Sequence, residues 1–236
     1  MGMRWLAALL DALAPPLCVL CRGPPSGLPW LCSTCERRLE LFAGARCLRC
    51  GAPHPLPAPV CGACPEWPRR LRSARSAAPH TGTARELVHA LKFHRRLEAA
   101  RPLGYLAAAA GRDLALPRDA VVVPVPLHWR KRRRRGFNQA DEIARVVAAE
   151  LGIPRRARWL RRVRFSESSV HRTPAGRRRE ARGAFRARAD VSGRHVLLVD
   201  DVLTTGATLG ACARACGRRG VAAVWAVTAT RSPSPR

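Results

Sequence analysis

Two adjacent carboxylates followed by a hydroxyl-rich loop form the most chemically specific stretch of this chain. Asp200 and Asp201 end a short apolar run, and a loop that contains three threonines and a glycine follows them. A loop that leads into a helix offers unpaired backbone N–H groups and the positive end of the helix dipole, and both suit a phosphate group. The carboxylates would repel a phosphate, so they must face another part of the ligand, such as vicinal ribose hydroxyls or a divalent cation. The candidate ligand residues of the loop are Thr204, Thr205, Gly206, Ala207 and Thr208.

Cysteines supply the second chemical pattern. Eight of the ten cysteines precede residue 65, and they form four C-x-x-C pairs. Two such pairs complete a tetrahedron of thiolates around a soft ion, so four pairs predict two zinc sites. Four cysteines leave no open coordination position, which makes each site structural, and the two-residue spacing disfavours a disulfide framework. The predicted ligands are Cys18, Cys21, Cys32, Cys35, Cys47, Cys50, Cys61 and Cys64.

The pairing of these cysteines stays open at this point. A sequential scheme joins the first pair with the second and the third with the fourth. An interleaved scheme joins the first pair with the third, and a single ion beside a vestigial knuckle is a further alternative. We favour the sequential scheme because residues 48–51 and 61–64 look like matched turn-forming knuckles.

The elements that must position the acidic loop follow from periodicity. From about Thr83 the chain alternates between helical and strand patterns, and Thr83 with Glu86 has the form of a capping box. Short continuous apolar runs are typical of strands buried on both faces, and alternation with helices predicts a parallel sheet with crossover helices. The acidic pair then lies at the carboxyl end of a strand, where open α/β sheets bind ligands. We predict helices over 83–91, 97–114, 140–151 and 207–219 and strands over 120–126, 195–199 and 221–228.

The stretch 196–209 closely resembles the phosphoribosyl-diphosphate-binding signature of type I phosphoribosyltransferases. The run Arg135-Gly136-Phe137-Asn138-Gln139, together with the upstream zinc knuckles, resembles the ComF family, and residues 91–96 match that family's lysine-containing loop. One segment departs from the family pattern, because residues 166–180 keep its arginines but lack its Gln and Asn. The resemblance covers nearly the whole chain. It implies a type I phosphoribosyltransferase fold, with an open and mainly parallel sheet and flanking helices, preceded by a small Cys-rich zinc-binding module.

The resemblance also implies roles for the site residues. Asp200 and Asp201 would hold the ribose hydroxyls, directly or through Mg2+, and residues 204–208 would cradle the 5-phosphate. Lys92 and the basic loop over 130–135 would neutralise the diphosphate leaving group. Departure of diphosphate develops negative charge on the leaving oxygens, so Mg2+ and cations aimed at those oxygens are the expected catalytic device. The expected catalytic residues are Asp200, Asp201, Lys92 and Arg135.

Charge points to a polyanionic partner. The 236 residues include 43 Lys and Arg against 16 Asp and Glu, so the formal net charge is +27. Such a surface attracts polyanions without sequence preference, although an Arg-rich composition is also compatible with a merely solvated surface. Arginine clusters at 130–135 and 177–179, with Trp129 and Trp159 nearby, favour contact with a single-stranded backbone and stacking on bases. The candidate nucleic-acid residues are Arg130, Lys131, Arg132, Arg133, Arg134 and Arg135.

Composition and residue spacing also limit the possible class of protein and its division into domains. Hydrophobic residues make up 47% of the chain, which excludes wholesale disorder. No apolar, uncharged run reaches about 18 residues, so we expect no membrane span. Residues 4–13 have the spacing of a short amphipathic helix rather than a signal peptide, because Asp11 interrupts the apolar run, and we expect a cytoplasmic protein. The expected parts are an N-terminal helix with a double zinc-knuckle module over 1–65, a connector over 66–82, and a phosphoribosyltransferase-like domain over 83–236.

Three functional hypotheses follow. An enzyme would transfer a phosphoribosyl group to an unidentified acceptor. A nucleic-acid-handling protein would use the same scaffold on transforming single-stranded DNA, since the ComF resemblance implies a role in natural competence with cytoplasmic recombination proteins as partners. A regulator would sense phosphoribosyl diphosphate without chemistry. Fold alone does not decide among them. All three expect structural Zn2+, and the first and third expect phosphoribosyl diphosphate with Mg2+.

Overall fold

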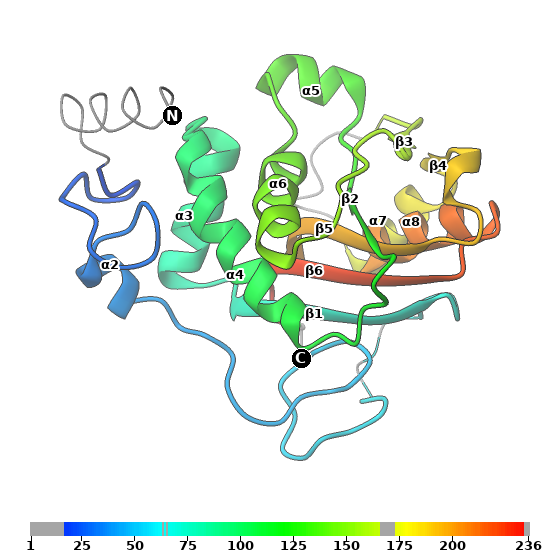
Figure 1. Ribbon diagram of the computed structural model, residues 1–236, viewed down its shortest axis with the longest axis horizontal. Helices are drawn as coiled ribbons and strands as arrows, with labels where there is room; N and C mark the ends of the chain where they lie inside the picture. The colour runs from blue at the N-terminus through cyan, green and yellow to red at the C-terminus, as the bar shows by residue number, and fades with distance from the viewer. Residues whose placement is uncertain (1–16, 63, 65, 166–172, 234–236) are drawn as a thin grey trace.

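A four-stranded parallel sheet forms the centre of the computed structural model (Figure 1), which describes residues 17–62, 64, 66–165 and 173–233. The strand order is β1-β6-β5-β2, so β5 and β6 are the two inner strands. Their apolar runs are buried on both faces, as expected for a sheet with crossover helices. The strands are β1 (Leu71–Pro79), β2 (Val121–Pro124), β5 (His195–Leu203) and β6 (Ala223–Arg231).

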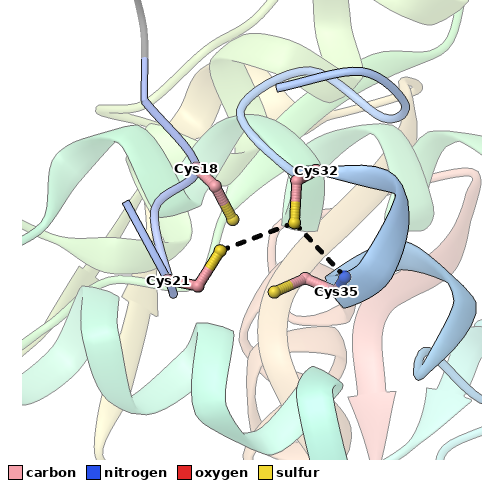
Figure 2. A group of neighbouring side chains, drawn as sticks. All are labelled: Cys18, Cys21, Cys32 and Cys35. Atoms are coloured by element: carbon pink, nitrogen blue, oxygen red, sulfur yellow. Dashed lines mark hydrogen bonds between the residues drawn. The ribbon is translucent and has the colours of Figure 1, made fainter. Parts of the chain in front are cut away.

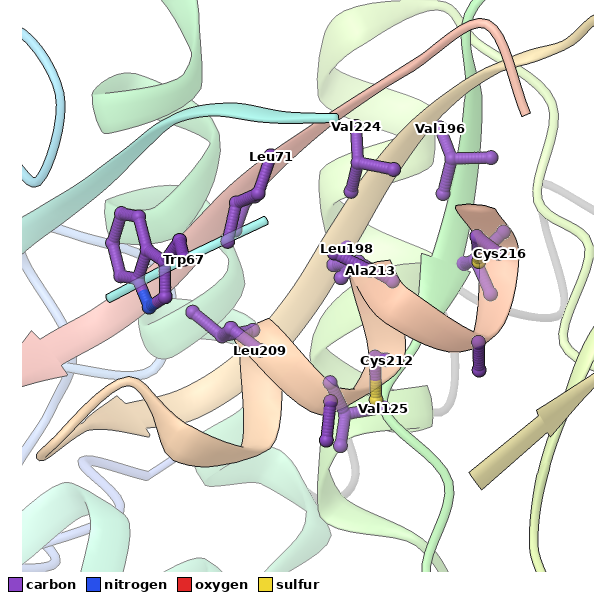
Figure 3. Packing of buried hydrophobic residues seen from close by; sticks show 14 of the residues in the cluster. Trp67, Leu71, Val125, Val196, Leu198, Leu209, Cys212, Ala213, Cys216 and Val224 are labelled. Atoms are coloured by element: carbon purple, nitrogen blue, oxygen red, sulfur yellow. The ribbon is translucent and has the colours of Figure 1, made fainter. Parts of the chain in front are cut away.

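Helices cover both faces of this sheet (Figure 1). On one face, α3 (Gly82–Phe93), α4 (Ala100–Arg112) and α6 (Gln139–Leu151) form a core with the inward side chains of the strands. On the other face lies α8 (Ala207–Gly217), whose Leu209, Cys212 and Cys216 pack against Val196 and Leu198 of β5 (Figure 3). Cys212 and Cys216 are therefore buried core residues, as their spacing on one helix face predicts.

A small antiparallel sheet packs outside α8. It consists of β3 (Leu160–Arg162) and β4 (Phe185–Ala187), and Phe185 is buried between this sheet and α8. Strands of three residues are too short to show a period, so sequence pattern does not predict them. The remaining short elements are α2 (Ser33–Arg37), η1 (Leu97–Ala99), α5 (Trp129–Arg135), α7 (Pro174–Ala181) and η2 (Ala189–Val191).

The structure corrects our prediction that residues 66–82 form a connector. It contains the whole of β1, an edge strand that pairs in parallel with β6. The strand sequence is rich in Ala, Ser and Arg and lacks the β-branched residues that signal a strand. Its conformation is stabilised instead by long-range contacts, because β6 pairs along one side and the backbone N–H of Ala74 donates to the carbonyl of Arg49 at 2.8 Å on the other.

Two local predictions near this strand also differ from the structure. Helix α3 begins at Gly82 with Thr81 as its N-cap, so Thr83 lies inside the helix and is buried. The capping-box prediction is wrong because Glu86 instead pairs with Arg38 at 3.5 Å. The basic segment that we expect to be a loop forms helix α5, which ends at Gly136 in the left-handed conformation.

Two predictions fall beyond the described residues. The amphipathic helix predicted over 4–13 lies outside the described residues, and so do residues 166–172 of the segment that departs from the ComF pattern. Within the described part of the chain, none of the helices has the length and apolar character that crossing a bilayer requires.

Candidate functional site

The carboxyl end of β5 brings together residues that are far apart in the sequence. Lys92, in the last turn of α3, places its Nζ 2.8 Å from Oδ2 of Asp201. Asp201 is only 4% exposed, and its backbone carbonyl accepts a hydrogen bond from the Thr230 hydroxyl at 3.3 Å. The lysine-containing segment and the acidic strand end, predicted separately, therefore meet at one place.

Asp200 has a different environment from its neighbour. Burial, and after it the charge of Asp201, raises the pKa of the Asp200 carboxyl to about 7, against the opposing effect of Lys92. Its Oδ1 accepts a hydrogen bond from the Asp201 backbone N–H at 2.9 Å. The protein thus compensates the negative charge at Asp200 only in part. Carboxylate oxygens are ligands that Mg2+ prefers, so this pair fits a divalent cation or ribose hydroxyls.

The threonine loop leads from these acids into α8. Gly206 has a φ of +69° and precedes the first residue of the helix, Ala207. Thr204 is exposed, and Thr205 and Thr208 are half-buried, so their hydroxyls face an open edge. The backbone N–H of Ala207 lies 3.4 Å from the Thr205 hydroxyl oxygen. The first N–H groups of an 11-residue helix have no helical acceptor, and with hydroxyls around them they can hold a phosphate group.

Helix α5 divides its cations between two environments. Arg132, Arg133 and Arg134 are exposed on a helix that begins five residues after β2 ends. Arg135 instead is half-buried and donates to Gln139 Oε1 at 2.6 Å. Burial lowers the pKa of Arg135, and the charge of Asp201 opposes that effect. The segment thus holds four exposed arginines, including Arg130, and two half-buried cations, Lys131 and Arg135.

Exposed aromatic side chains lie beside α5. Trp129 is 56% exposed and Phe165 is 42% exposed. The Arg130 guanidinium lies 5.4 Å from both ring centroids, and the His128 ring lies 5.1 Å from that of Phe165. Trp159 belongs to another environment, since it packs against the hydrophobic core. The arginines at 177–179 lie on α7 rather than α5.

Two further site residues escape the sequence analysis. His80, just after β1, contacts the Thr230 hydroxyl through Nδ1 at 3.0 Å, and burial together with the charge of Lys92 lowers its pKa to about 4. Arg162 of β3 has a pKa that burial lowers, and Asp200 is among the charges that oppose the effect. Neither residue belongs to a motif. His80 can be placed near the site only once β1 is known to be a strand.

The cysteines form two clusters of four, and the pairing is sequential. Cys18, Cys21, Cys32 and Cys35 gather in one (Figure 2), and Cys47, Cys50, Cys61 and Cys64 gather in the other. Sγ–Sγ distances of 3.4 Å, 3.6 Å and 3.7 Å in the second cluster exclude disulfides and approach the roughly 3.8 Å edge of a tetrahedral zinc–thiolate site. The donor set therefore fits structural zinc, and the interleaved scheme is excluded.

Backbone geometry at the clusters favours thiolates, the form that binds zinc. Backbone N–H groups of Cys35 and Cys50 lie 3.4 Å and 3.5 Å from the sulfurs of Cys32 and Cys47. Burial would raise the pKa of Cys47, but N–H groups from Cys50 and Cys61 outweigh it and lower that pKa to about 6. Each ribbon thus presents a knuckle that is preorganised for a metal ion.

Comparisons with known proteins agree with this division. The model of the double zinc ribbon domain matches residues 9–65, and that of the phosphoribosyl transferase domain matches residues 133–236. The DNA utilization protein YhgH of Salmonella typhi is 37% identical over 215 residues, which covers 89% of this chain and 94% of that protein. Competence protein F of Haemophilus influenzae is 30% identical over 221 residues, covering 86% and 92%. Competence protein ComFC of Bacillus subtilis is 28% identical over 200 residues, covering 82% and 80%.

These matches, the parallel sheet and the two cysteine clusters confirm the predicted fold, a phosphoribosyltransferase-type α/β domain preceded by a zinc-binding module. The matched range of the transferase domain includes Arg135 and the acidic loop but begins after Lys92. The place of Lys92 in the site therefore depends on its contact with Asp201.

Proposed function

Because this chain belongs to the ComF family, we propose that it binds phosphoribosyl diphosphate together with Mg2+ at the carboxyl end of β5 and acts in natural competence. The observation that carries the proposal is the ion pair between Lys92 and Asp201 beside an open threonine loop. The names of the relatives, which refer to competence and to DNA utilization, support the biological role.

Each side chain has a place in this proposal. The loop over 204–208 holds the 5-phosphate, and Asp200 and Asp201 face the ribose hydroxyls. Lys92 and Arg135 face the diphosphate. Asp200 and Asp201 are the residues that would hold Mg2+, and the ion would supply positive charge that offsets the negative charge of the diphosphate.

A transfer reaction breaks the bond between the anomeric carbon and a diphosphate oxygen, and the electron pair leaves with that oxygen. An acceptor then donates its own electron pair to the anomeric carbon. Lys92 and Arg135 would stabilise the negative charge that develops on the leaving group. Release of diphosphate in the presence of nucleobases would identify an enzyme, and binding without release would identify a sensor.

The binding proposal is tested by calorimetry with phosphoribosyl diphosphate, with and without Mg2+. We expect Asp200→Asn to weaken Mg2+-dependent binding by at least about tenfold, because it removes a ligand oxygen, and to keep the wild-type melting temperature. Asp119→Asn is the matched control, since Asp119 pairs with His195 at 2.8 Å at the opposite end of β5. Unchanged affinity in the Asp200→Asn variant would argue against the assigned site.

A specific surface favours single-stranded DNA as a second ligand. Arg132, Arg133 and Arg134 are exposed, and the exposed rings of Trp129 and Phe165 lie on the same side of the molecule as Arg130. Cations that follow a phosphate backbone and rings that stack on bases are the two parts of a sequence-tolerant single-strand site. We propose that α5 and these rings contact DNA.

The salt dependence of binding tests this surface. Each phosphate neutralised on a single strand contributes about −0.7 to the slope of log affinity against log salt, so changing Arg132, Arg133 and Arg134 to Gln should flatten the slope by up to about 2. The control changes three exposed arginines outside α5 to Gln: Arg69 and Arg72, at the start of the edge strand β1, and Arg219, which follows α8. Equal slopes in the two triple variants would place the DNA contact elsewhere.

A further inference from the structure

Trp67 joins the second zinc ribbon to the threonine loop. The indole is buried, and its Nε1–H donates to the carbonyl of Gly206 at 3.1 Å. A Cβ atom added at Gly206 would lie 2.5 Å from that nitrogen, and one added at Gly210 would lie 3.1 Å from the indole Cδ1. The ring therefore lies directly against the loop and the first turn of α8, beside Leu209 (Figure 3).

The ribbon holds Trp67 from the other side. Arg49 lies inside the knuckle that carries Cys50, and its Nη2 donates to the Trp67 carbonyl at 3.0 Å. The same knuckle is attached to the sheet, because Arg231 at the end of β6 donates to the Cys50 carbonyl at 2.7 Å. Cys47, Cys50 and Cys61 belong to the same buried cluster as Trp67. An ordered knuckle and an ordered indole are therefore parts of one packed unit.

The geometry of the Gly206–Ala207 peptide explains why this contact matters. The carbonyl of Gly206 and the N–H of Ala207 belong to one planar group and point in opposite directions. When Trp67 binds the carbonyl, it orients the N–H at the start of α8, which is one of the donors available to a phosphate. The same carbonyl also accepts the helical hydrogen bond from the Gly210 N–H at 2.9 Å, and the Ala207 N–H donates to the Thr205 hydroxyl oxygen at 3.4 Å. Trp67 therefore adds a second donor, from outside the helix, to a carbonyl that α8 already binds.

We propose that the second zinc site, acting through Trp67, positions the threonine loop for the 5-phosphate of its ligand. This inference rests on the proposed function, and it makes Trp67 a positioning residue outside the matched range of the transferase domain. Loss of zinc from the second cluster then weakens phosphate binding without any change in the residues that contact the phosphate.

The first ribbon provides an internal control. It packs against α3 and α4 on the opposite face of the sheet, where Arg96 donates to the Val19 carbonyl at 2.6 Å. Its tryptophan, Trp30, lies under the Arg101 guanidinium at 5.5 Å. Because this ribbon contacts the helix that carries Lys92, the probe must lack a diphosphate. Ribose 5-phosphate meets that condition.

The first experiment compares two conservative variants. Trp67→Phe keeps an aromatic ring but loses the Nε1–H donor, and Trp30→Phe makes the same change in the first ribbon. We expect Trp67→Phe to weaken ribose 5-phosphate binding about fivefold, the effect of one lost hydrogen bond, with zinc content unchanged. Trp30→Phe should stay within about twofold of wild type. In the same way, Cys61→Ser should weaken binding, whereas Cys32→Ser should not.

A second measurement uses the wild-type protein. The chain has six tryptophans, and each gives one indole N–H resonance. The Trp67 resonance, assigned through its contacts with the neighbouring Leu209 side chain, should shift when ribose 5-phosphate is added to the wild-type protein, and its position should differ in Cys61→Ser, which removes a ligand of the second cluster. This readout supports or overturns the inference even if Trp67→Phe does not fold.

The outcomes separate the inference from the proposed function. If wild-type protein binds phosphoribosyl diphosphate but Trp67→Phe and Cys61→Ser bind ribose 5-phosphate normally, or the Trp67 resonance does not move with the ligand, the inference is wrong and the function stands. If wild-type protein binds neither compound, the proposed function fails and the inference fails with it.

Discussion

At the scale of single residues, two adjacent aspartates have different chemistry because they face different neighbours. Asp201 is buried against Lys92, which neutralises it. At Asp200, burial and after it the charge of Asp201 raise the pKa to about 7, although Lys92 opposes the effect. The pair is therefore divided into a carboxylate that organises the site and one that titrates near neutral pH.

The raised pKa of Asp200 predicts a pH dependence of stability. Its ordinary value is 3.8, so the folded protein holds this proton more tightly than the unfolded chain does. The resulting stability is fully present below about pH 4 and is lost as the pH rises through about 7. The free energy of unfolding of the wild type, measured relative to Asp200→Asn by denaturant titration, should fall across that window. Parallel profiles for the two proteins would contradict the raised pKa.

The Lys92–Asp201 pair predicts a difference between two matched variants. Asp201→Asn leaves the ammonium group without its carboxylate, and we expect the free energy of unfolding to fall by about 1–3 kcal/mol. Asp200→Asn should not lower stability at neutral pH, because it removes a charge that burial disfavours. Chemical unfolding measures both. A double-mutant cycle with Lys92→Met tests whether the stability loss in Asp201→Asn comes from the ion pair. Additive effects of the two substitutions would show that Lys92 and Asp201 are not coupled.

At the scale of elements, the site depends on how closely two helices cross. A Cβ added at Gly104 of α4 would lie 2.4 Å from Cβ of Val146 in α6, so the glycine permits the helices to approach. Helix α6 in turn supports the site, because Gln139 at its first position accepts the Arg135 hydrogen bond and Asn138 donates to the Val125 carbonyl at 3.1 Å.

The close crossing of α4 and α6 predicts how a methyl group added at Gly104 changes the stability of the protein. Gly104→Ala should lower the free energy of unfolding by about 1–3 kcal/mol through overpacking, despite the higher helix propensity of alanine. Val146→Ala removes the atoms that the new methyl group would meet, so the double variant should recover part of the loss. Thermal and chemical unfolding of the three variants measure this, and a Gly104→Ala protein as stable as wild type would show that α4 and α6 separate easily.

At the scale of the whole molecule, the two ribbons are attached to opposite faces of the sheet. The first shares a core with α3, α4 and α6, and the second shares a core with β1 and α8. The described part of the first 65 residues contains one short helix, α2, and little regular structure besides it. Segments of this kind are held by their metal sites rather than by a core of their own.

This arrangement predicts close to two zinc ions per chain. Elemental analysis of the purified protein measures the content, and a strong chelator should lower the melting temperature of the whole chain because both cores lose a covering segment. A thiol titration after metal removal checks the assignment, because it should detect the eight cysteines of the two clusters as free thiols. Protein that contained no zinc and had quantitative disulfides instead would contradict the assignment.

Features that a local pattern encodes can be predicted from the amino-acid sequence. The strand, acids and threonines from His195 to Thr208 are contiguous, and the eight cysteines are recognisable by their spacing alone. The inner strands β5 and β6 are apolar over several residues because both of their faces are buried, so their composition identifies them. The fold class followed from these elements and their order.

Other features depend on contacts between segments that are distant in the sequence, and only the tertiary structure shows them. The cysteines cluster in the sequential pairing, β1 is a strand in spite of its composition, and Lys92 contacts Asp201. The tertiary structure also divides the basic segment, since Arg135 is half-buried and bound to Gln139 whereas Arg132, Arg133 and Arg134 are exposed. The Trp67 contact with Gly206 spans 139 residues. No local pattern carries such information, because the energy of each contact arises only when packing brings both partners together.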